Sequence, residues 1–176
     1  MQGIINVILN LFSRKFLIKI SLILKPFFEL IFKGDRFVDP INNKSYSYFF
    51  PYGYNKLRKN ALSPGTLSLE RHRLLWIFLE KETDFFNTEN KILHIAPEQC
   101  FYKSFKKNFE SYTTCDLNSP IAEIRADVCN LPFDENEFDF VLCNHVLEHV
   151  YDDEKAMKEI YRVCLLYTSD AADDDR

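Results

Sequence analysis

Three short strand-like runs between residues 91 and 150 are followed by side chains that could bind a ligand or move a proton. The runs are Ile92–Ile95, Tyr112–Cys115 and Phe138–Cys143, and the polar side chains after them are Glu98, Asp116, Asn144 and His145. A carboxylate accepts hydrogen bonds from the hydroxyl groups of a ligand. A histidine can act as a general base because its pKa lies near working pH. The pattern therefore indicates a binding site assembled from the ends of strands.

The elements around these residues predict an α/β fold. Strand-like runs alternate with helical segments, and 152–163 has an N-capping Asp152 and one apolar side formed by Ala156, Ile160 and Val163. Parallel strands need such crossover helices, and ligands bind outside the carboxyl ends of the strands. We predict a Rossmann-like, partly complete parallel sheet with crossover helices, preceded by an apolar, basic N-terminal helix.

The segment from Asp127 to Val150 carries the most specific pattern, D-V-x-x-L-P-F-x-x-x-x-F-D-x-V-x-x-x-x-V-L-E-H-V. This phrase resembles a signature of class I S-adenosylmethionine-dependent methyltransferases, and the domain is similar to methyltransferase type 11. The resemblance implies S-adenosylmethionine as cofactor and methyl transfer to an unknown acceptor. It covers roughly half of the chain well and the stretch 51–86, which is similar to a bacterial group of methyltransferase-domain proteins, only loosely.

The resemblance also assigns roles to side chains at the strand ends. Asp116, followed by Leu117, would accept hydrogen bonds from both ribose hydroxyls. Asp127 would accept from the adenine amino group, and the backbone N–H of Val128 would bind a ring nitrogen. Taken singly, each Asp is as well explained by a turn. Their order and spacing around the Leu131-Pro132-Phe133 turn favour the binding role.

The loop after the first run departs from the family pattern. Methyltransferases usually have an acid and several glycines there, whereas this chain reads LHIAPEQC. His94 stands in place of the acid, Ala96 and Glu98 stand in place of glycines, and Pro97 lacks an N–H donor. Glu98 would contact the amino group or sulfonium of the cofactor, or begin the next helix as a favourable first-turn acid.

No residue is assigned a catalytic role with certainty. In relatives, the position of Asn144 and His145 contacts the methionine part of the cofactor or the substrate. His145 is the candidate general base, while His149 is better explained as a helix-end residue. Methyl transfer from a sulfonium depends mainly on in-line positioning, so it often needs little acid–base help.

The two ends of the chain differ from its middle. The last thirteen residues include CLLYTSDAAD, which resembles the translation of a sequencing adapter, so we expect 164–176 to be an artefactual tail and the enzyme to be truncated after Val163. The tail contributes −3 to the net charge of −4, which leaves −1 for residues 1–163. That balance gives no reason to expect nucleic-acid binding.

Residues 1–36 are strongly apolar and basic, and predict an amphipathic helix kinked at Pro26. No uncharged run is long enough to span a bilayer. The helix could lie on a membrane surface through residues 1–33, with its cations near anionic headgroups, or pack on protein. We favour the membrane slightly, which would place the protein in the cytoplasm, peripheral at the inner membrane face. The cysteines weakly favour a reducing compartment.

Residues 37–67 predict an aromatic, loop-rich lead-in with one short strand at 45–50. In some similar proteins paired cysteines hold zinc here, at positions that correspond to 39–42 and 63–66. This chain has no cysteine at those positions, so we expect no metal, and we expect aromatic packing to hold any surviving turn.

The methyltransferase segment, 68–163, is predicted to open with a helix over 68–86 that Ser68 caps. Its apolar stripe would contain Leu69, Leu74, Leu75, Phe78 and Leu79, with Trp76 beside it. The cluster Glu70–Arg73 forms either a solvated helix turn or, as the resemblance suggests for Arg71 and Arg73, a contact to substrate or cofactor.

Two other functions remain open. A different Rossmann enzyme, such as an NAD-dependent one, would need a G-x-G-x-x-G loop that this chain lacks. A non-enzymatic or remnant nucleotide-binding module would fit the loss of the glycines and the expected truncation.

Overall fold

The computed structural model describes residues 23–24, 26–53 and 56–165. The chain divides into two compact units, Met1–Glu82 and Thr83–Arg176, which we call the N-terminal and C-terminal units. Most of the predicted N-terminal helix and the tail from residue 166 therefore lie outside the described residues.

The C-terminal unit contains the predicted parallel sheet. Its strands are β5 (Ile92–Ile95), β6 (Tyr112–Asp116), β7 (Ile124–Arg125) and β8 (Phe140–Cys143). Their order is β7-β6-β5-β8, and every pairing is parallel, with Ile92 opposite both Tyr112 and Phe140. All four residues of the central strand β5 are buried. The predicted Rossmann-like α/β fold is thus confirmed.

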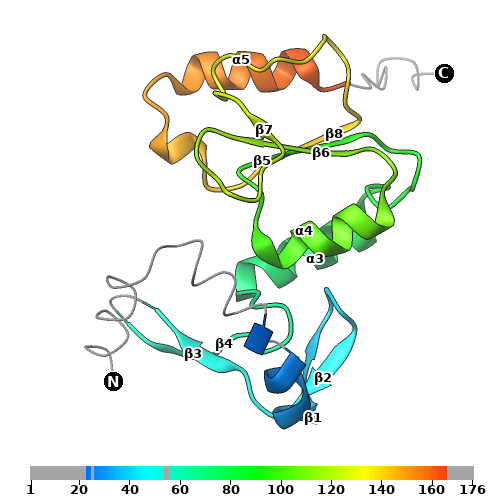
Figure 1. Cartoon of the computed structure of the whole chain (residues 1–176), viewed down its shortest axis with the longest axis vertical. Coiled ribbons are helices and arrows are strands. Elements are labelled where there is room, and N and C mark those ends of the chain that lie inside the picture. Colours follow the sequence, from blue (N-terminus) through cyan, green and yellow to red (C-terminus); the bar gives the residue numbers. More distant parts are fainter. Residues whose placement is uncertain (1–22, 25, 54–55, 166–176) are drawn as a thin grey trace, which may run out of the picture. The chain divides into compact units, whose positions relative to one another are not determined.

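Helices cover both faces of this sheet (Figure 1). On one face α4 (Gln99–Asn108) contributes Phe101 and Phe105, whose rings stack with centroids 5.2 Å apart. On the other face α5 (Asp153–Val163) contributes Ala156 and Val163 to an apolar core. Strand alternation explains this division, because Leu93 and Ile95 belong to the α5 core.

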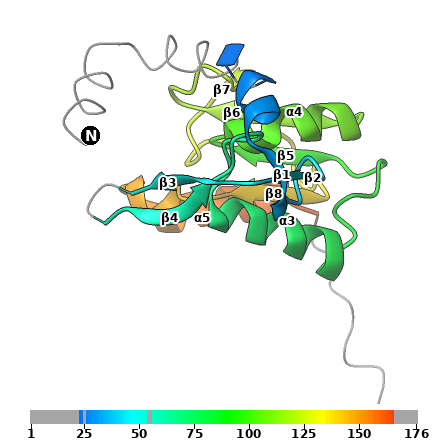
Figure 2. The same ribbon diagram turned by 90° about the horizontal axis from the view of Figure 1, so that it is seen from below.

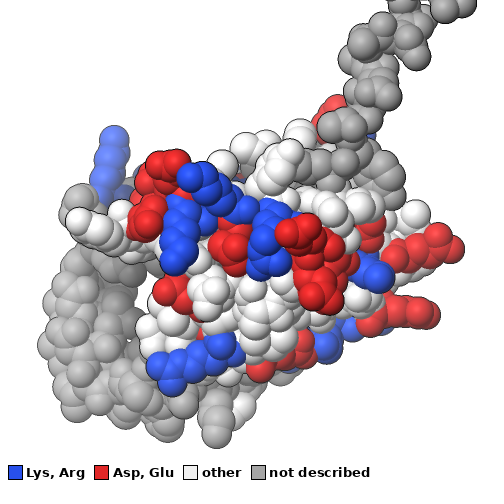
Figure 3. Space-filling view, turned by 90° about the horizontal axis from the view of Figure 1, so that it is seen from above, with Lys and Arg blue, Asp and Glu red and all other residues white. Residues whose placement is uncertain are grey.

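The start of α5 agrees with the prediction, since the Asp152 side chain accepts a hydrogen bond from the backbone N–H of Lys155 at 3.0 Å. Around α5, Lys and Arg side chains are interspersed with Asp and Glu (Figure 3). One such pair joins Lys158 to Glu154 at 2.7 Å. Beyond the helix, the N–H of Leu165 donates to the carbonyl of Phe138.

The N-terminal unit differs from the predicted loop-rich lead-in. It has two antiparallel hairpins: β1 (Lys33–Asp39) with β2 (Lys44–Tyr46), and β3 (Phe50–Tyr52) with β4 (Arg58–Leu62) (Figure 2). The single strand predicted at 45–50 was therefore wrong. Strand β1 also takes residues 33–36, which the predicted helix included. Within this strand, a Cβ at Gly34 would lie 2.5 Å from the backbone nitrogen of Ser47. Only glycine allows that close approach.

Helix α3 (Glu70–Glu82) is shorter than the predicted 68–86. Ser68 does not cap it; instead Nδ1 of His72 accepts the N–H of Leu69 at 3.0 Å, as the Glu of a capping box would do. Its buried side holds His72, Trp76 and Leu79. The predicted apolar stripe was wrong at Leu74 and Phe78, which are exposed.

This unit has two similar five-residue turns: residues 39–43 join β1 to β2, and residues 63–67 follow β4. In the first turn the N–H of Asn43 donates to the carbonyl of Asp39, and Asn43 has φ +57°. In the second the N–H of Leu67 donates to the carbonyl of Ser63, and Leu67 has φ +60°. Each turn therefore ends in a left-handed residue.

Hydrogen bonds hold the two turns together. The buried Asp39 carboxylate accepts the Ile41 N–H on Oδ1 at 3.1 Å and the Thr66 hydroxyl on Oδ2 at 2.5 Å. The amide of Asn42 donates to the Tyr46 hydroxyl at 2.9 Å. Aromatic rings, including Tyr46 and Phe49, pack nearby, but polar contacts join the turns directly, which the prediction of purely aromatic packing did not include.

Candidate functional site

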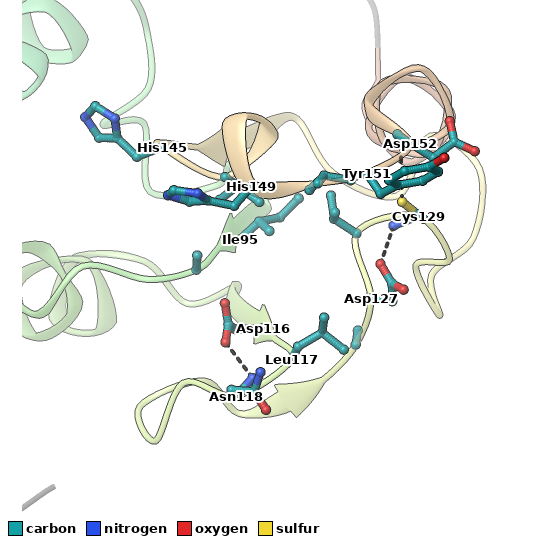
Figure 4. A pocket seen from close by; sticks show the side chains of 15 residues that line it. Ile95, Asp116, Leu117, Asn118, Asp127, Cys129, His145, His149, Tyr151 and Asp152 are labelled. Atoms are coloured by element: carbon teal, nitrogen blue, oxygen red, sulfur yellow. Dashed lines mark hydrogen bonds between the residues drawn. The ribbon is translucent and has the colours of Figure 1, made fainter. Parts of the chain in front are cut away.

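A cavity of about 440 Å³ lies at the carboxyl ends of the parallel strands in the C-terminal unit (Figure 4). This size lies in the range of small-molecule sites. Six of the predicted site residues line it: Ala96, Asp116, Leu117, Asp127, Val128 and His145. The other four, His94, Pro97, Glu98 and Asn144, are not part of its lining. The sheet thus brings together residues that are separated by up to fifty positions in the sequence.

Asp116 ends β6 at the edge of the cavity. Its Oδ1 accepts the backbone N–H of Asn118 at 2.7 Å (Figure 4). The same oxygen accepts the backbone N–H of Ser119 at 2.5 Å. These bonds form a turn, which is the alternative role that the sequence analysis gave to Asp116. Both bonds use the same oxygen, so the turn and a ligand contact through Oδ2 are compatible.

Asp127 and Val128 follow β7 and form a second wall of the cavity. Oδ1 of Asp127 accepts the N–H of Cys129 at 2.9 Å (Figure 4), and the Val128 side chain belongs to the apolar core. Asp127 is therefore also oriented by its own turn, while Val128 anchors the loop to the α5 side of the sheet.

The turn at Leu131–Phe133 is fixed by a pair of side chains on α5 that the sequence analysis missed. Arg162 donates from Nη2 to the Leu131 carbonyl at 2.9 Å and from Nη1 to the Phe133 carbonyl at 2.7 Å. Glu159 accepts the Leu131 N–H at 2.8 Å and pairs with Arg162. The hydrogen bond from Arg162 lowers the pKa of Glu159. Their i, i+3 spacing on one helix was the available sequence signal.

Two cavity residues have backbone angles that glycine usually adopts. Ala96 follows β5 with φ +51°, and His145 follows β8 with φ +55°. Left-handed angles cost energy for residues with a Cβ, and such strain gathers at functional sites. Nδ1 of His145 lies 3.1 Å from Oε1 of Glu148, and both side chains are more than half exposed. The candidate base is therefore accessible to an acceptor.

Three of the predicted residues outside the lining, His94, Glu98 and Asn144, form a connected polar group. His94 is fully buried, with Nδ1 2.8 Å from the Tyr112 hydroxyl and Nε2 2.7 Å from Oε2 of Glu98. The Asn144 amide donates to the same Glu98 oxygen at 3.4 Å. His94 thus contacts Glu98 rather than the cavity itself.

The cavity has a further wall that sequence reasoning assigned no binding role. After the β8 end, His149, Val150, Tyr151 and Asp152 line it, at and beyond the short helix η1 (Leu147–His149). The expected helix-end position of His149 is compatible with its place in the lining. The signal that could have identified this wall is its position directly after a strand end.

Within the described ranges, no cluster of three or more His, Cys, Asp or Glu side chains could hold a metal ion. Over the same residues, no helix has the length and apolarity to cross a membrane.

One comparison with known proteins agrees with the predicted family. Residues 89–165 match a family model described as a methyltransferase domain. The resemblance to class I methyltransferases is therefore confirmed for this segment. No curated protein gives a significant match. Among solved structures, the YcgJ protein from Bacillus subtilis aligns with a TM-score of 0.45 and 20% identity, over 54% of this chain and 47% of that chain. The chain thus spans about half the length of that relative.

Proposed function

We propose that the methyltransferase domain at 89–165 binds S-adenosylmethionine in the strand-end cavity and transfers its methyl group to an acceptor that enters from the His145 side. One observation carries this proposal: Asp116, Asp127 and the end of β8 surround a single cavity, inside the segment that matches the methyltransferase family.

The lining suits the polar groups of this cofactor. The Asp116 carboxylate can accept from the ribose hydroxyls, and an amide at this position would lose part of that acceptor capacity. The Asp127 carboxylate can accept from the adenine amino group beside the Val128 N–H. Apolar side chains that include Leu117 and Val150 supply the surface on which an adenine ring can rest.

The cofactor, when bound, supplies an electrophilic methyl group on a sulfonium. The chain orients the reacting groups, and the Glu159–Arg162 pair keeps the Leu131–Phe133 turn in place. Some methyl acceptors must lose a proton during the transfer. His145 is the candidate general base for that proton, because its side chain is exposed at the edge of the cavity.

Calorimetric titration of the full chain with S-adenosylhomocysteine and with NAD tests the proposal. We expect S-adenosylhomocysteine to bind and Asp116→Asn to weaken binding about tenfold or more, since hydrogen bonds to a charged group contribute about 1.5–3 kcal/mol. Asp134→Asn, an exposed position away from the cavity lining, is the matched control. Preference for NAD would favour the other Rossmann enzyme, and binding of neither would favour a non-enzymatic module.

We also propose that the N-terminal segment contacts a membrane surface. Residues 23–24 and 26–31 are helical, and Ile23, Phe27 and Leu30 are 72%, 58% and 74% exposed. The opposite side is anchored to the unit, since the rings of Phe28 and Phe32 meet that of Phe50 at 5.6 and 4.9 Å. An exposed apolar stripe on an anchored helix suits the headgroup–acyl boundary of a bilayer.

Cosedimentation of the full chain with anionic and with neutral vesicles tests this contact. We expect the anionic vesicles to bind it better, and the double variant Phe27→Asp/Leu30→Asp to reduce that binding. Leu74→Asp, at an equally exposed apolar position on α3, should leave it unchanged. Equal binding of all three proteins would contradict the proposal. A bound protein would be peripheral to the membrane on its cytoplasmic, inner face.

A further inference from the structure

We propose that the N-terminal unit binds the phosphate group of an anionic phospholipid through Lys33 and Lys44, in a cavity beside the exposed apolar stripe of Ile23, Phe27 and Leu30. This inference rests on the proposed membrane contact, to which it adds a defined site for one headgroup. The cavity shares no residue with the strand-end cavity of the C-terminal unit.

The cavity has a volume of about 570 Å³ and lies within the N-terminal unit. One wall comes from the helical stretch 26–31, which contributes Glu29 and Leu30. The other wall comes from the hairpin of β1 and β2, which contributes Lys33 and Lys44. This volume lies in the range of small-molecule sites, so a headgroup can enter the cavity.

Strand pairing brings the two lysines together. Lys33 of β1 is paired with Tyr46 of β2, and Lys44 lies two residues before Tyr46, so the three side chains belong to one face of the hairpin. Among the described lining residues, the charged side chains are these two lysines and Glu29, which gives a net charge of +1. The negative charge of a phosphate is complementary to this lining, and it would offset the repulsion between the two ammonium groups.

Glu29 restricts one of the two ammonium groups without using all of its hydrogens. Oε2 of Glu29 lies 2.6 Å from Nζ of Lys44, and the Glu29 side chain is 20% exposed against 56% for that of Lys44. An ammonium group has three hydrogens to donate. Lys44 can therefore keep this partner and donate to a phosphate oxygen as well.

The helical wall of the cavity is anchored to the hairpin. The carbonyl of Phe32 accepts the N–H of Ser47 at 2.8 Å and its hydroxyl at 3.2 Å. The rings of Phe28 and Phe32 also contact that of Phe50. A cavity between two anchored walls is pre-formed, which lowers the free-energy cost of ordering it when a ligand binds.

Leu30 connects the cavity with the apolar stripe. It lines the cavity and is 74% exposed, and the exposed Ile23 and Phe27 complete the stripe. A phospholipid has its phosphate directly beside its acyl chains, so the phosphate can reach the lysines while the chains lie on the stripe. A free phosphate would contact the lysines alone, so the apolar part of the site favours a lipid.

Calorimetry with two soluble probes tests the site in the full chain. Dihexanoylphosphatidylglycerol, kept below its micelle concentration, has a phosphate and two short acyl chains. Glycerophosphoglycerol is the same headgroup without the chains. We expect the short-chain lipid to bind about tenfold or more tightly than the headgroup, because each CH₂ that it buries on the stripe adds to the affinity.

Variants identify the residues that bind the phosphate. The double variant Lys33→Gln/Lys44→Gln should weaken binding of the short-chain lipid about tenfold or more. Lys33→Gln alone keeps the Lys44 pair with Glu29 and should still weaken binding several-fold. The control Lys56→Gln/Lys59→Gln removes two exposed lysines of the same unit outside the cavity lining, and should leave binding unchanged. Urea unfolding followed by the fluorescence of the single tryptophan shows whether each variant is folded.

The outcomes are distinct. Equal losses in the two double variants would indicate diffuse attraction between charges and would overturn the site. Equal affinities for the lipid and for glycerophosphoglycerol would identify a free phosphate compound as the ligand and overturn the lipid assignment. If the full chain binds anionic vesicles but neither probe, the site is refuted while the membrane contact stands. If it binds neither vesicles nor probes, the membrane contact fails and this inference fails with it.

Discussion

Replacing the buried Asp39 with alanine should destabilise the N-terminal unit by about 2–4 kcal/mol. The carboxylate accepts the Ile41 N–H at 3.1 Å and the Thr66 hydroxyl at 2.5 Å, and so joins the two turns. In the alanine variant Thr66 keeps a partner, the Ser68 hydroxyl at 2.7 Å. The buried Ile41 N–H loses its side-chain acceptor, which costs about 1–3 kcal/mol, and the bond between the two turns is lost in addition.

Two terms limit this cost. The variant no longer buries a charge, which returns part of the desolvation penalty. The guanidinium of Arg73 also still donates to the carbonyl of Ser68, the residue that follows the second turn, at 2.7 Å. Asp39→Asn should cost only about 1 kcal/mol, because its amide oxygen can accept from Ile41 while its amino group donates to Thr66.

Urea unfolding followed by tryptophan fluorescence measures the effect. Trp76 is the single tryptophan of the chain and lies buried in α3, so its signal reports on the N-terminal unit. Asp35→Ala, at an exposed position in the same strand, is the control. If Asp39→Ala and Asp35→Ala unfold within about 0.5 kcal/mol of each other, the bond between the turns is not what stabilises this unit.

Two further predictions concern the C-terminal unit. Burial raises the pKa of Cys115 from 9.0 to about 12 and that of Cys143 to about 11, so the folded chain keeps both thiol protons where the unfolded chain loses them. The stability that these protonated thiols contribute is therefore present below about pH 9 and lost as the pH rises towards 11–12. At pH 8, iodoacetamide should label Cys143 about 100-fold more slowly in the folded than in the denatured protein, as measured by mass spectrometry. Ala96→Gly should raise the free energy of unfolding by up to about 1 kcal/mol, because glycine adopts a φ of +51° without strain. The control Ala156→Gly in α5 should lower the free energy of unfolding by about 1 kcal/mol or more. If thermal melts show a change of the same sign for both variants, the strain argument is wrong.

The parallel sheet could be predicted because its central strand is buried on both faces. A strand such as β5, with all four residues buried, reads as a continuous apolar run that ends abruptly. Helix α5 could be predicted for a similar reason, since its cap and its buried residues Ala156 and Val163 follow the helical period. In both elements, local sequence and tertiary burial favour the same structure.

The hairpins of the N-terminal unit could not be predicted in this way. Strands β2 and β3 have three residues each, too few to establish an alternating pattern, and both pairings contain register shifts. Their stability comes from contacts distant in sequence, such as the bond between Thr66 and Asp39. Helix α3 shows the reverse problem, because tertiary contacts buried His72 and left Leu74 exposed, against their ordinary preferences.

The sequence predicted which residues lie at the candidate site better than it predicted their contacts. The departure from a glycine-rich loop suggested a remnant, yet each substitution in that loop has a defined place. Ala96 adopts a left-handed angle that glycine would adopt, and the buried His94 is hydrogen-bonded to the partly exposed Glu98. A loop that had lost its function would be under no requirement to keep a strained alanine and a costly buried polar group. These two features therefore weigh against the remnant interpretation and favour a binding loop.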